Sequence, residues 1–363
     1  MKRICFFIEK MYDVGGMERV LSVCANSLCE KYTLSIAIFN QKGKPYSFAL
    51  NDTINLYDLG IKNYTKKEIK KTLSSFLIYH QFDIVVSMGG TDMYYLHSIK
   101  DKSKKIVWLH FAIDIFKTAW IGPHPSFKKK IIAQIQTWRR IYHAIQFDKI
   151  VVLTNADLIA WKRYTGKVER IYNPVTIKNS IASTRKMKRA ISLGRLEYQK
   201  GYDFLVKAWA VVNKIHPDWY LDIYGDGSQK EELQQMINDL HISDKVTLCG
   251  RTSDVVKELQ NHSIYVMSSR AEGMPLVLLE AASCALPLVS FSCPFGPDEI
   301  IENGVNGFLV SKVGDIATLA DRICILIKNE KLRNWMGENA LLKVSSFSVN
   351  KFENNWISLL NKM

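Results

Sequence analysis

The chain has 363 residues, of which 47% are hydrophobic and 23% are charged, and it carries a net charge of +14 at pH 7. This composition is that of a globular protein and excludes disordered and fibrous classes, and the length suits two domains. No apolar run is long enough for a membrane span, and Glu9 and Lys10 interrupt the first apolar stretch before a signal-peptide core is complete, so we expect a cytoplasmic protein.

Short runs of β-branched and aromatic residues alternate with helical patterns in the first half of the chain. This alternation predicts a parallel α/β sheet. At Asn173 the pattern breaks, and the chain stays polar as far as Arg189, so we expect domains of residues 1–172 and 173–346. The expected strands are Ile4–Ile8, Leu34–Phe39, Ile84–Ser87, Ile106–His110 and Ile150–Thr154, and the expected helices are Gly16–Lys31, Lys66–Gln81, Phe127–Phe147 and Ala156–Thr165.

The positive charge is concentrated in the first half. Residues 1–172 hold 27 Lys and Arg against 14 Asp and Glu, whereas residues 173–363 hold 22 against 21. This excess favours an anionic partner, either a membrane surface, a phosphorylated acceptor or nucleic acid, although no nucleic-acid reader motif accompanies it. The basic segment Phe127–Tyr142 has the spacing of an interfacial amphipathic helix, and the alternative is a helix that packs its apolar side on the domain.

The second half repeats the alternation of strands and helices. Two doubly wound domains in tandem are therefore expected, with ligands at the carboxyl ends of the strands. A last helical segment at Phe347–Leu360 could pack on either domain. The expected strands are Ile191–Leu193, Tyr220–Tyr224, Val246–Cys249, Ile264–Met267, Leu288–Phe291 and Phe308–Val310, and the expected helices are Asp203–Ile215, Gln229–Leu240, Val255–Gln260, Pro275–Ala285, Asp298–Glu302 and Ile316–Asn329.

The stretch Arg270–Ala285 sets two glutamates eight positions apart. Gly273 allows a bend and Pro275 has a fixed φ, so a helix is expected to start near Pro275. Its residues are almost all apolar, and a carboxylate at Glu280 within it needs hydrogen-bond partners. Glu272 precedes the helix start, where free N–H groups favour a phosphate or a polar ligand. The alternative is a core helix preceded by an ordinary surface acid.

Two cations follow the strand Ile191–Leu193. Arg195 and Lys200 can both reach a crevice at the carboxyl edge of the sheet, where they would suit a diphosphate. The alternative for Arg195 is a surface ion pair with Glu197. The sequence contains no D-x-D triplet and no cluster at metal-ligand spacing, so we expect no metal site and no cofactor.

Two glycines and a histidine follow strands of the first half. Gly15 and Gly16 open a helix, where they let a ligand approach the backbone or simply form a tight turn. His110 ends the strand Ile106–His110 at the same kind of edge, where a histidine is as often structural as functional.

The chain also resembles a known family. The resemblance is to the family-4 retaining glycosyltransferases, and it spans most of the chain, most densely from Ile191 to Val310. It implies the GT-B fold, in which two Rossmann-like domains face each other across a cleft, with the donor on the second, the acceptor on the first, and the C-terminal helix 347–363 returning to the first. The motifs that carry it are G-G-M-E-R from Gly15, G-R-L-x-x-x-K-G from Gly194, G-D-G from Gly225, E-G-M-P-L-V-L-L-E-A from Glu272 and G-V-N-G-F-L-V from Gly304.

The resemblance also implies roles for single residues. It assigns Arg195 and Lys200 to the donor diphosphate, and Glu280 to the ribose hydroxyls. It makes Glu272 a contact of the transferred sugar and sets His110 beside that sugar, so that these two residues and the two cations form the implied catalytic set. The other implied donor contacts are Gly16, Arg251, Gly273, Met274 and Leu276, and the implied acceptor contacts are Gly15 and Gly16.

The segment Ser292–Ile301, S-C-P-F-G-P-D-E-I-I, resembles members that transfer galactose or N-acetylgalactosamine from UDP during surface-glycan assembly. This implies metal-independent, retaining transfer of a hexose or N-acetylhexosamine to a lipid-linked or polysaccharide acceptor, with the nucleotide-sugar as substrate. The basic half fits peripheral contact with the inner face of an anionic membrane, and nucleic acid is disfavoured. Other GT-B activities, such as a nucleotide-sugar epimerase, and a non-catalytic nucleotide-sugar-binding protein remain alternatives.

Overall fold

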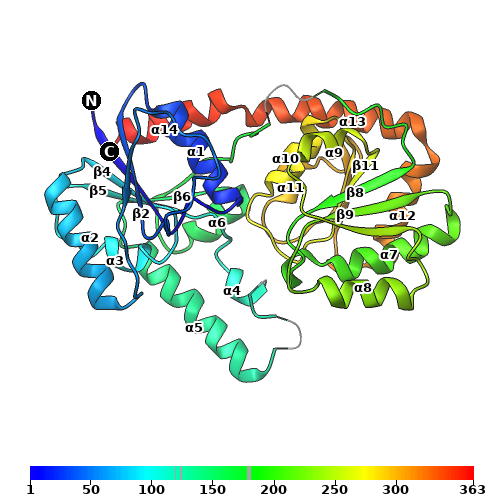
Figure 1. Ribbon diagram of the computed structural model, residues 1–363, viewed down its shortest axis with the longest axis horizontal. Coiled ribbons are helices and arrows are strands. Elements are labelled where there is room, and N and C mark those ends of the chain that lie inside the picture. The colour runs from blue at the N-terminus through cyan, green and yellow to red at the C-terminus, as the bar shows by residue number, and fades with distance from the viewer. Residues whose placement is uncertain (119, 123–124, 178–180) are drawn as a thin grey trace. The chain divides into compact units, whose positions relative to one another are not determined.

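The computed structural model describes residues 1–118, 120–122, 125–177 and 181–363 of the chain (Figure 1). Contacts divide the chain into two compact units. The first comprises residues 1–113, 134–176 and 348–363, and the second comprises residues 114–133 and 177–347. Residues 178–180 of the expected polar linker lie outside the described residues.

The first unit is built on a seven-stranded parallel sheet in the order β3-β2-β1-β4-β5-β6-β7. Its central strands are almost continuously apolar and buried, as expected for a parallel sheet covered on both faces. The strands are β1 Arg3–Ile8, β2 Thr33–Ile38, β3 Asn55–Asp58, β4 Ile84–Ser87, β5 Lys104–Trp108, β6 Lys149–Val152 and β7 Val168–Arg170.

Several helices of the first unit begin at side-chain caps. Thr65 accepts a hydrogen bond from the Glu68 N–H, Thr154 accepts one from the Asp157 N–H, and Ser348 accepts one from the Lys351 N–H. The helices are α1 Gly16–Leu28, α2 Lys66–His80, α3 Met93–Leu96, α6 Asn155–Lys162 and α14 Val349–Asn361, and α5 Phe127–Ala144 is a continuous helix that starts among the residues assigned to the second unit.

Helix α14 packs on α1 of the first unit. Trp356 is buried against Trp108 and Phe6, with ring centroids 4.8 Å and 6.1 Å apart. The ammonium of Lys2 donates to the carbonyl of Leu360 at 2.8 Å. The last helix is therefore part of the core of the first unit.

The second unit holds a six-stranded parallel sheet in the order β10-β9-β8-β11-β12-β13. Its strands are β8 Arg189–Leu193, β9 Tyr220–Tyr224, β10 Val246–Gly250, β11 Ile264–Met267, β12 Leu288–Phe291 and β13 Gly307–Val310. Its helices are α4 Ile115–Thr118, α7 Tyr202–Ile215, α8 Lys230–Asp239, α9 Val255–Gln260, α10 Leu276–Ser283, α11 Pro297–Ile300, α12 Ile316–Lys328 and α13 Glu330–Val344, with short 3₁₀ turns at Tyr198–Lys200 and Ser345–Phe347.

Each sheet reverses its strand order once, between β1 and β4 in the first unit and between β8 and β11 in the second. In open parallel sheets, ligands bind outside the carboxyl ends of the strands at such a switch point. The switch point of the second sheet is where the residues after β8 and β11 meet, and these residues include Arg195, Lys200 and Glu272. The observed fold therefore places these three predicted donor residues at the edge where a ligand is expected.

The structure differs from the expected elements at several places. Strands β3 and β7 and the short helices α3 and α4 were not expected, and β5 ends at Trp108, so His110 lies two residues beyond the strand and not in it. Helix α13 was also missed. Asn329, the expected end of the preceding helix, caps α13 by accepting a hydrogen bond from the Leu332 N–H at 3.0 Å.

In the part of the chain that the structure describes, no helix has the length and apolar character needed to span a bilayer.

Candidate functional site

A lysine and a glutamate are bonded to each other at the switch point of the second sheet. The ammonium of Lys200 donates to Glu272 Oε1 at 2.7 Å, and the hydroxyl of Ser269 donates to the same oxygen at 2.6 Å. Glu272 is only 6% exposed, so this carboxylate is held by charge and hydrogen bonding in a largely dry place. The sequence had suggested both charged residues but not Ser269, whose proximity to Glu272 in the chain is the one available signal.

Helix α10 begins directly after this carboxylate. Pro275 is its N-cap with an extended backbone, and Leu276 is its first residue, so the expected start near Pro275 is confirmed. The first N–H groups of a helix lack intrahelical partners and favour an anion. Glu280, in the next turn, is 2% exposed, which confirms that this carboxylate is buried.

The loop at Arg270–Gly273 is anchored by groups that the sequence did not single out. Arg270 forms a two-bond ion pair with Asp203, with both N–O distances at 2.8 Å, and its guanidinium lies over the ring of Tyr198, 3.9 Å from the centroid. The amide of Gln199 donates to the carbonyl of Ala271 at 2.9 Å. These bonds fix the backbone on which Glu272 stands.

The loop after β8 packs closely on the loops beside it. The aliphatic part of the Lys200 side chain passes over Gly194, because a Cβ at Gly194 would lie 3.4 Å from Lys200 Cε. The absence of a side chain at Gly194 leaves space for Lys200. Ser228 donates to the carboxylate of Glu197 through its N–H at 3.0 Å and its hydroxyl at 2.7 Å. These bonds, with a smaller effect from the charge of Arg195, lower the pKa of Glu197.

Arg195 is exposed, and among the described residues no ion pair joins it to Glu197. Glu197 is engaged by Ser228, so the surface-pair alternative for Arg195 is not what the structure has. Arg251 is 83% exposed and lies 3.7 Å from a carboxylate oxygen of Asp226. It follows β10, two strands away from the Lys200–Glu272 pair in the sheet order.

The predicted residues of the first unit occupy the carboxyl edge of their own sheet. Gly15 is the N-cap of α1 and Gly16 its first residue, and a Cβ at Gly15 would lie 2.2 Å from the carboxylate of Glu18. The Glu18 carboxylate thus already lies beside this helix start. His110 is buried next to Trp108, and its Nε2 has no hydrogen-bond partner. Burial lowers the pKa of His110 to about 3, so the imidazole is neutral at pH 7.

Three further polar residues meet at the switch point of the first sheet. The N–H of Thr91 donates to the carboxylate of Glu9 at 3.0 Å, and its hydroxyl donates to the same oxygen at 2.5 Å. Asp92 is fully buried, and burial raises its pKa to about 7 against the opposing effect of hydrogen bonding by Ser87. The sequence did not reveal this group, although Glu9 directly follows β1 and Thr91 and Asp92 follow β4.

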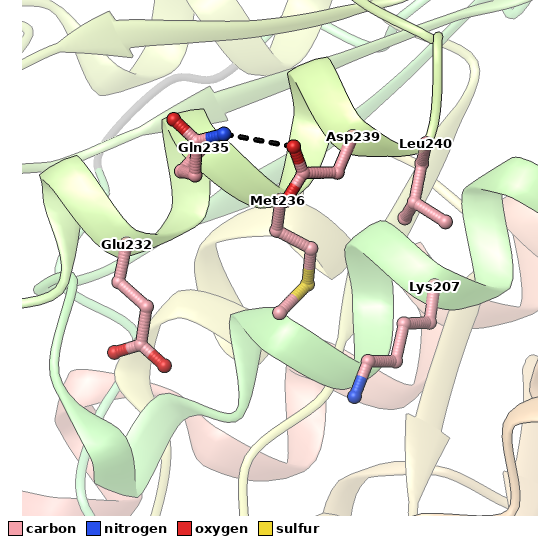
Figure 2. A pocket seen from close by; sticks show the side chains of 6 residues that line it. All are labelled: Lys207, Glu232, Gln235, Met236, Asp239 and Leu240. Carbon is pink, nitrogen blue, oxygen red and sulfur yellow. Dashed lines mark hydrogen bonds between the residues drawn. The ribbon is translucent and has the colours of Figure 1, made fainter.

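A hollow of about 390 Å³ lies outside this constellation, between α7 and α8 (Figure 2). Its lining includes Lys207, Glu232 and Asp239, and the amide of Gln235 donates to Asp239 at 2.7 Å. None of the predicted site residues lines it. Within the described ranges, no three His, Cys, Asp or Glu side chains are grouped as metal ligands would be.

Comparison with known proteins adds independent information. Residues 176–343 match the family model for glycosyl transferases of group 1. An uncharacterised glycosyltransferase of Haemophilus influenzae is 31% identical, over 99% of this chain and all of that protein. A Campylobacter jejuni protein, named as an α-1,4-N-acetyl-D-galactosaminyltransferase acting on a diphosphoundecaprenol-linked glycan, is 24% identical over 99% of this chain and 98% of its own.

Solved structures show the same architecture. The crystal structure of Anabaena HepE in complex with UDP and glucose superposes with a TM-score of 0.78 at 19% identity, covering all of both chains. A mutant of Staphylococcus aureus TarM, in complex with fondaparinux, α-GlcNAc-glycerol and UDP, superposes with a TM-score of 0.81 at 17% identity, over 99% of this chain and all of that one. With two parallel α/β units, these likenesses show that the chain has the GT-B fold.

Proposed function

The chain belongs to the glycosyltransferases, and from that premise we propose that it moves a hexose or an N-acetylhexosamine from a UDP-sugar to a lipid-linked or surface-glycan acceptor. The transfer retains the anomeric configuration and needs no metal ion. We assign the enzyme to family 4, and to the cytoplasmic side of the membrane as a peripheral protein.

The Lys200–Glu272 contact at the switch point is the observation that carries this proposal. Glu272 takes one of the three donors of the Lys200 ammonium, so two remain for diphosphate oxygens. Arg195, exposed in the loop after β8, supplies a second cation with a planar fork of donors. The start of α10 adds N–H groups that favour the same anion.

The charges suggest how the reaction proceeds. The bond between the anomeric carbon and the diphosphate breaks with its electron pair passing to the β-phosphate, through an oxocarbenium-like state. Lys200 and Arg195 stabilise the negative charge that develops there. The acceptor hydroxyl attacks the same face of the sugar and gives its proton to the departing β-phosphate, so configuration is retained and the atoms balance.

The carboxylates have separate roles in this proposal. Glu272 accepts hydrogen bonds from hydroxyls of the transferred sugar, beside the N–H groups of Gly273 and Met274, and Glu280 binds the ribose hydroxyls. His110, neutral at pH 7, offers an uncharged nitrogen to the sugar, and Gly15 and Gly16 approach the acceptor. Arg251 belongs to the loop that we assign to the base.

The choice of UDP and of a lipid-linked acceptor rests on the relatives. The HepE and TarM crystals contain UDP, and the Campylobacter protein is named for a polyprenol-linked acceptor. The segment Ser292–Ile301 supports a galactose-type or N-acetylgalactosamine-type sugar through the resemblance described above.

The decisive experiment is a screen of nucleotide-sugars for slow donor hydrolysis, read as released nucleotide, because it needs no acceptor. With the best donor, Lys200→Met and Glu272→Gln are each expected to lower turnover by about 100-fold or more, since they remove groups that act in the transition state. Matched controls are Lys207→Met and Glu232→Gln, which change the same residue types in the hollow of Figure 2.

The result also separates the alternatives. An epimerase would interconvert two UDP-sugars without net release of UDP, and a non-catalytic binding protein would bind UDP-sugar without turnover. If the two site variants kept wild-type turnover, the assignment of Lys200 and Glu272 would be wrong.

A further inference from the structure

Helix α5 presents a stripe of large apolar side chains to solvent. The apolar stripe, defined as Phe127, Ile131, Ile135, Trp138 and Tyr142, follows helical spacing of four, four, three and four residues, so its members lie on one face. All five are exposed, with Phe127 at 80% and Ile135 at 60%. Clustered apolar exposure of this kind marks an interaction surface.

The opposite face of α5 is the one that packs on the protein. Its buried residues are mostly small or polar, and they include Arg140, whose guanidinium donates to the carbonyl oxygens of Phe111 and Ala112. They are Ala133, Thr137, Arg140, Ile141 and Ala144. The alternative from the sequence, an apolar side packed on the domain, is therefore wrong, because the large apolar side chains point to solvent.

The charged side chains of helix α5 itself are all positive. Helix α5 contains no Asp or Glu, and its first turn holds Lys128, Lys129 and Lys130. All three lysines are exposed, and in the described ranges none takes part in an ion pair. Arg139 lies over the ring of Tyr94, 4.6 Å from its centroid, and leaves the helix positive along its length.

We propose that the apolar stripe and the lysine turn dock this protein on an anionic phospholipid bilayer. The aromatic and aliphatic side chains enter the interfacial region, while the ammonium groups of Lys128–Lys130 contact lipid phosphates. A second copy of the chain fits less well, because a symmetric contact through α5 would bring two sets of lysines together with no acid on the helix to offset them.

This inference identifies the residues that make the membrane contact included in the proposed function. Only the biological role of the contact rests on that function. Docking requires neither donor nor acceptor. It is therefore measured on the full chain without substrates.

The experiment is co-sedimentation of the full-length protein with vesicles of phosphatidylglycerol and phosphatidylcholine, compared with vesicles of phosphatidylcholine alone. The wild type is expected to bind the anionic vesicles at least about tenfold more tightly, and this preference should shrink as salt is added. Replacing Lys128, Lys129 and Lys130 together by Gln should weaken binding by about 100-fold.

A second variant tests the apolar stripe itself. Ile131→Ser, Ile135→Ser and Trp138→Ser combined should weaken binding at least about tenfold, because these side chains lose their burial in the bilayer. The matched control changes the exposed apolar residues of another basic helix, Ile78→Ser and Tyr79→Ser in α2, and should bind as the wild type does. Circular dichroism of each variant checks that the fold is kept.

Three results would overturn the proposal. The first is equal binding to neutral and anionic vesicles, and the second is unchanged binding by both α5 variants. The third is that the wild type binds no vesicles but forms a dimer, whereas the stripe variant is a monomer. The last result would assign the stripe to a second copy. Donor hydrolysis by the same variants reports separately on the transferase function, and it should remain at the wild-type rate.

Discussion

Gly296 is a residue at which two loops of the second unit approach each other closely. Its φ of 113° is rarely adopted by other residues, and a Cβ there would lie 2.2 Å from the carbonyl oxygen of Gly273 and 2.7 Å from Pro275 Cδ. Because Gly273 follows Glu272 and Pro275 caps α10, any displacement at Gly296 moves the groups assigned to the donor.

Gly296→Ala is therefore expected to lower donor turnover at least about tenfold, since misplacement of about 1 Å is enough to have such an effect. It should also reduce the midpoint of thermal unfolding. The control is Gly304→Ala, where φ is 82° but no atom lies within 4 Å of the added Cβ. Gly304→Ala introduces the backbone strain but no clash with a neighbouring loop. If both variants had the same turnover, the contact of Gly296 with Gly273 and Pro275 would not matter for the donor site.

His110 gives a residue-scale prediction about pH. Burial holds its pKa at about 3, below the value of about 6.5 for an unfolded histidine, so the unfolded chain binds the extra proton first. Above about pH 6.5, His110 is neutral in both the folded and the unfolded chain and costs no stability. As the pH falls from about 6.5 toward about 3, protonation of the unfolded chain lowers the free energy of unfolding. His110→Gln should thus reduce the loss of unfolding free energy between pH 7.5 and pH 4.5 by about 2 to 3 kcal/mol, measured by urea titration. An unchanged loss would contradict the buried, neutral state.

At the residue scale, the sequence predicted Lys200 and Glu272 and missed the residues that hold them in place. Lys200 and Glu272 belong to recognisable motifs, and the structure brings them into contact. Ser269 donates to Glu272, and Arg270 fixes the loop by pairing with Asp203, which stands 67 positions away in the chain. Local spacing contains no information on such a pairing.

At the element scale, α14 is expected to be essential to the first unit. Trp356→Ala removes a fully buried indole from its contacts with Trp108 and Phe6, and should destabilise the unit by about 3 to 5 kcal/mol. Chemical unfolding followed by circular dichroism measures the loss. Trp335→Ala on α13, where the indole is exposed, should change stability by less than about 1 kcal/mol. If Trp356→Ala also lowered the free energy of unfolding by less than about 1 kcal/mol, α14 would add little to the core.

The elements that the sequence predicted well are those with a buried, apolar pattern. Strand β1, expected at Ile4–Ile8, runs from Arg3 to Ile8, and α10 starts where Pro275 suggested. Strands β3 and β7 were missed because they are short, lie at the sheet edges and are only partly buried. The orientation of α5 could not be predicted, because the same spacing fits an apolar face turned inward or outward.

At the scale of the whole molecule, the residues proposed to bind the donor diphosphate, ribose and base all fall in the second unit. UDP without acceptor should slow amide hydrogen exchange at residues 193–201 and 268–280, because ligand binding stabilises the segments that hold it. Exchange in α2, in the first unit, should stay unchanged. Mass spectrometry of peptides measures both, and protection confined to the first unit would contradict the assignment of the donor site.

The return of α14 to the first unit has a consequence for synthesis. The ribosome makes residues 177–347 before Trp356, so every strand of the second sheet has been translated while the first unit still lacks a central part of its core. The second unit can fold on the nascent chain. Trp108 and Phe6, in contrast, cannot pack against Trp356 until it has been synthesised, more than two hundred residues after Trp108. We therefore expect the first unit, most of which is translated first, to finish folding last.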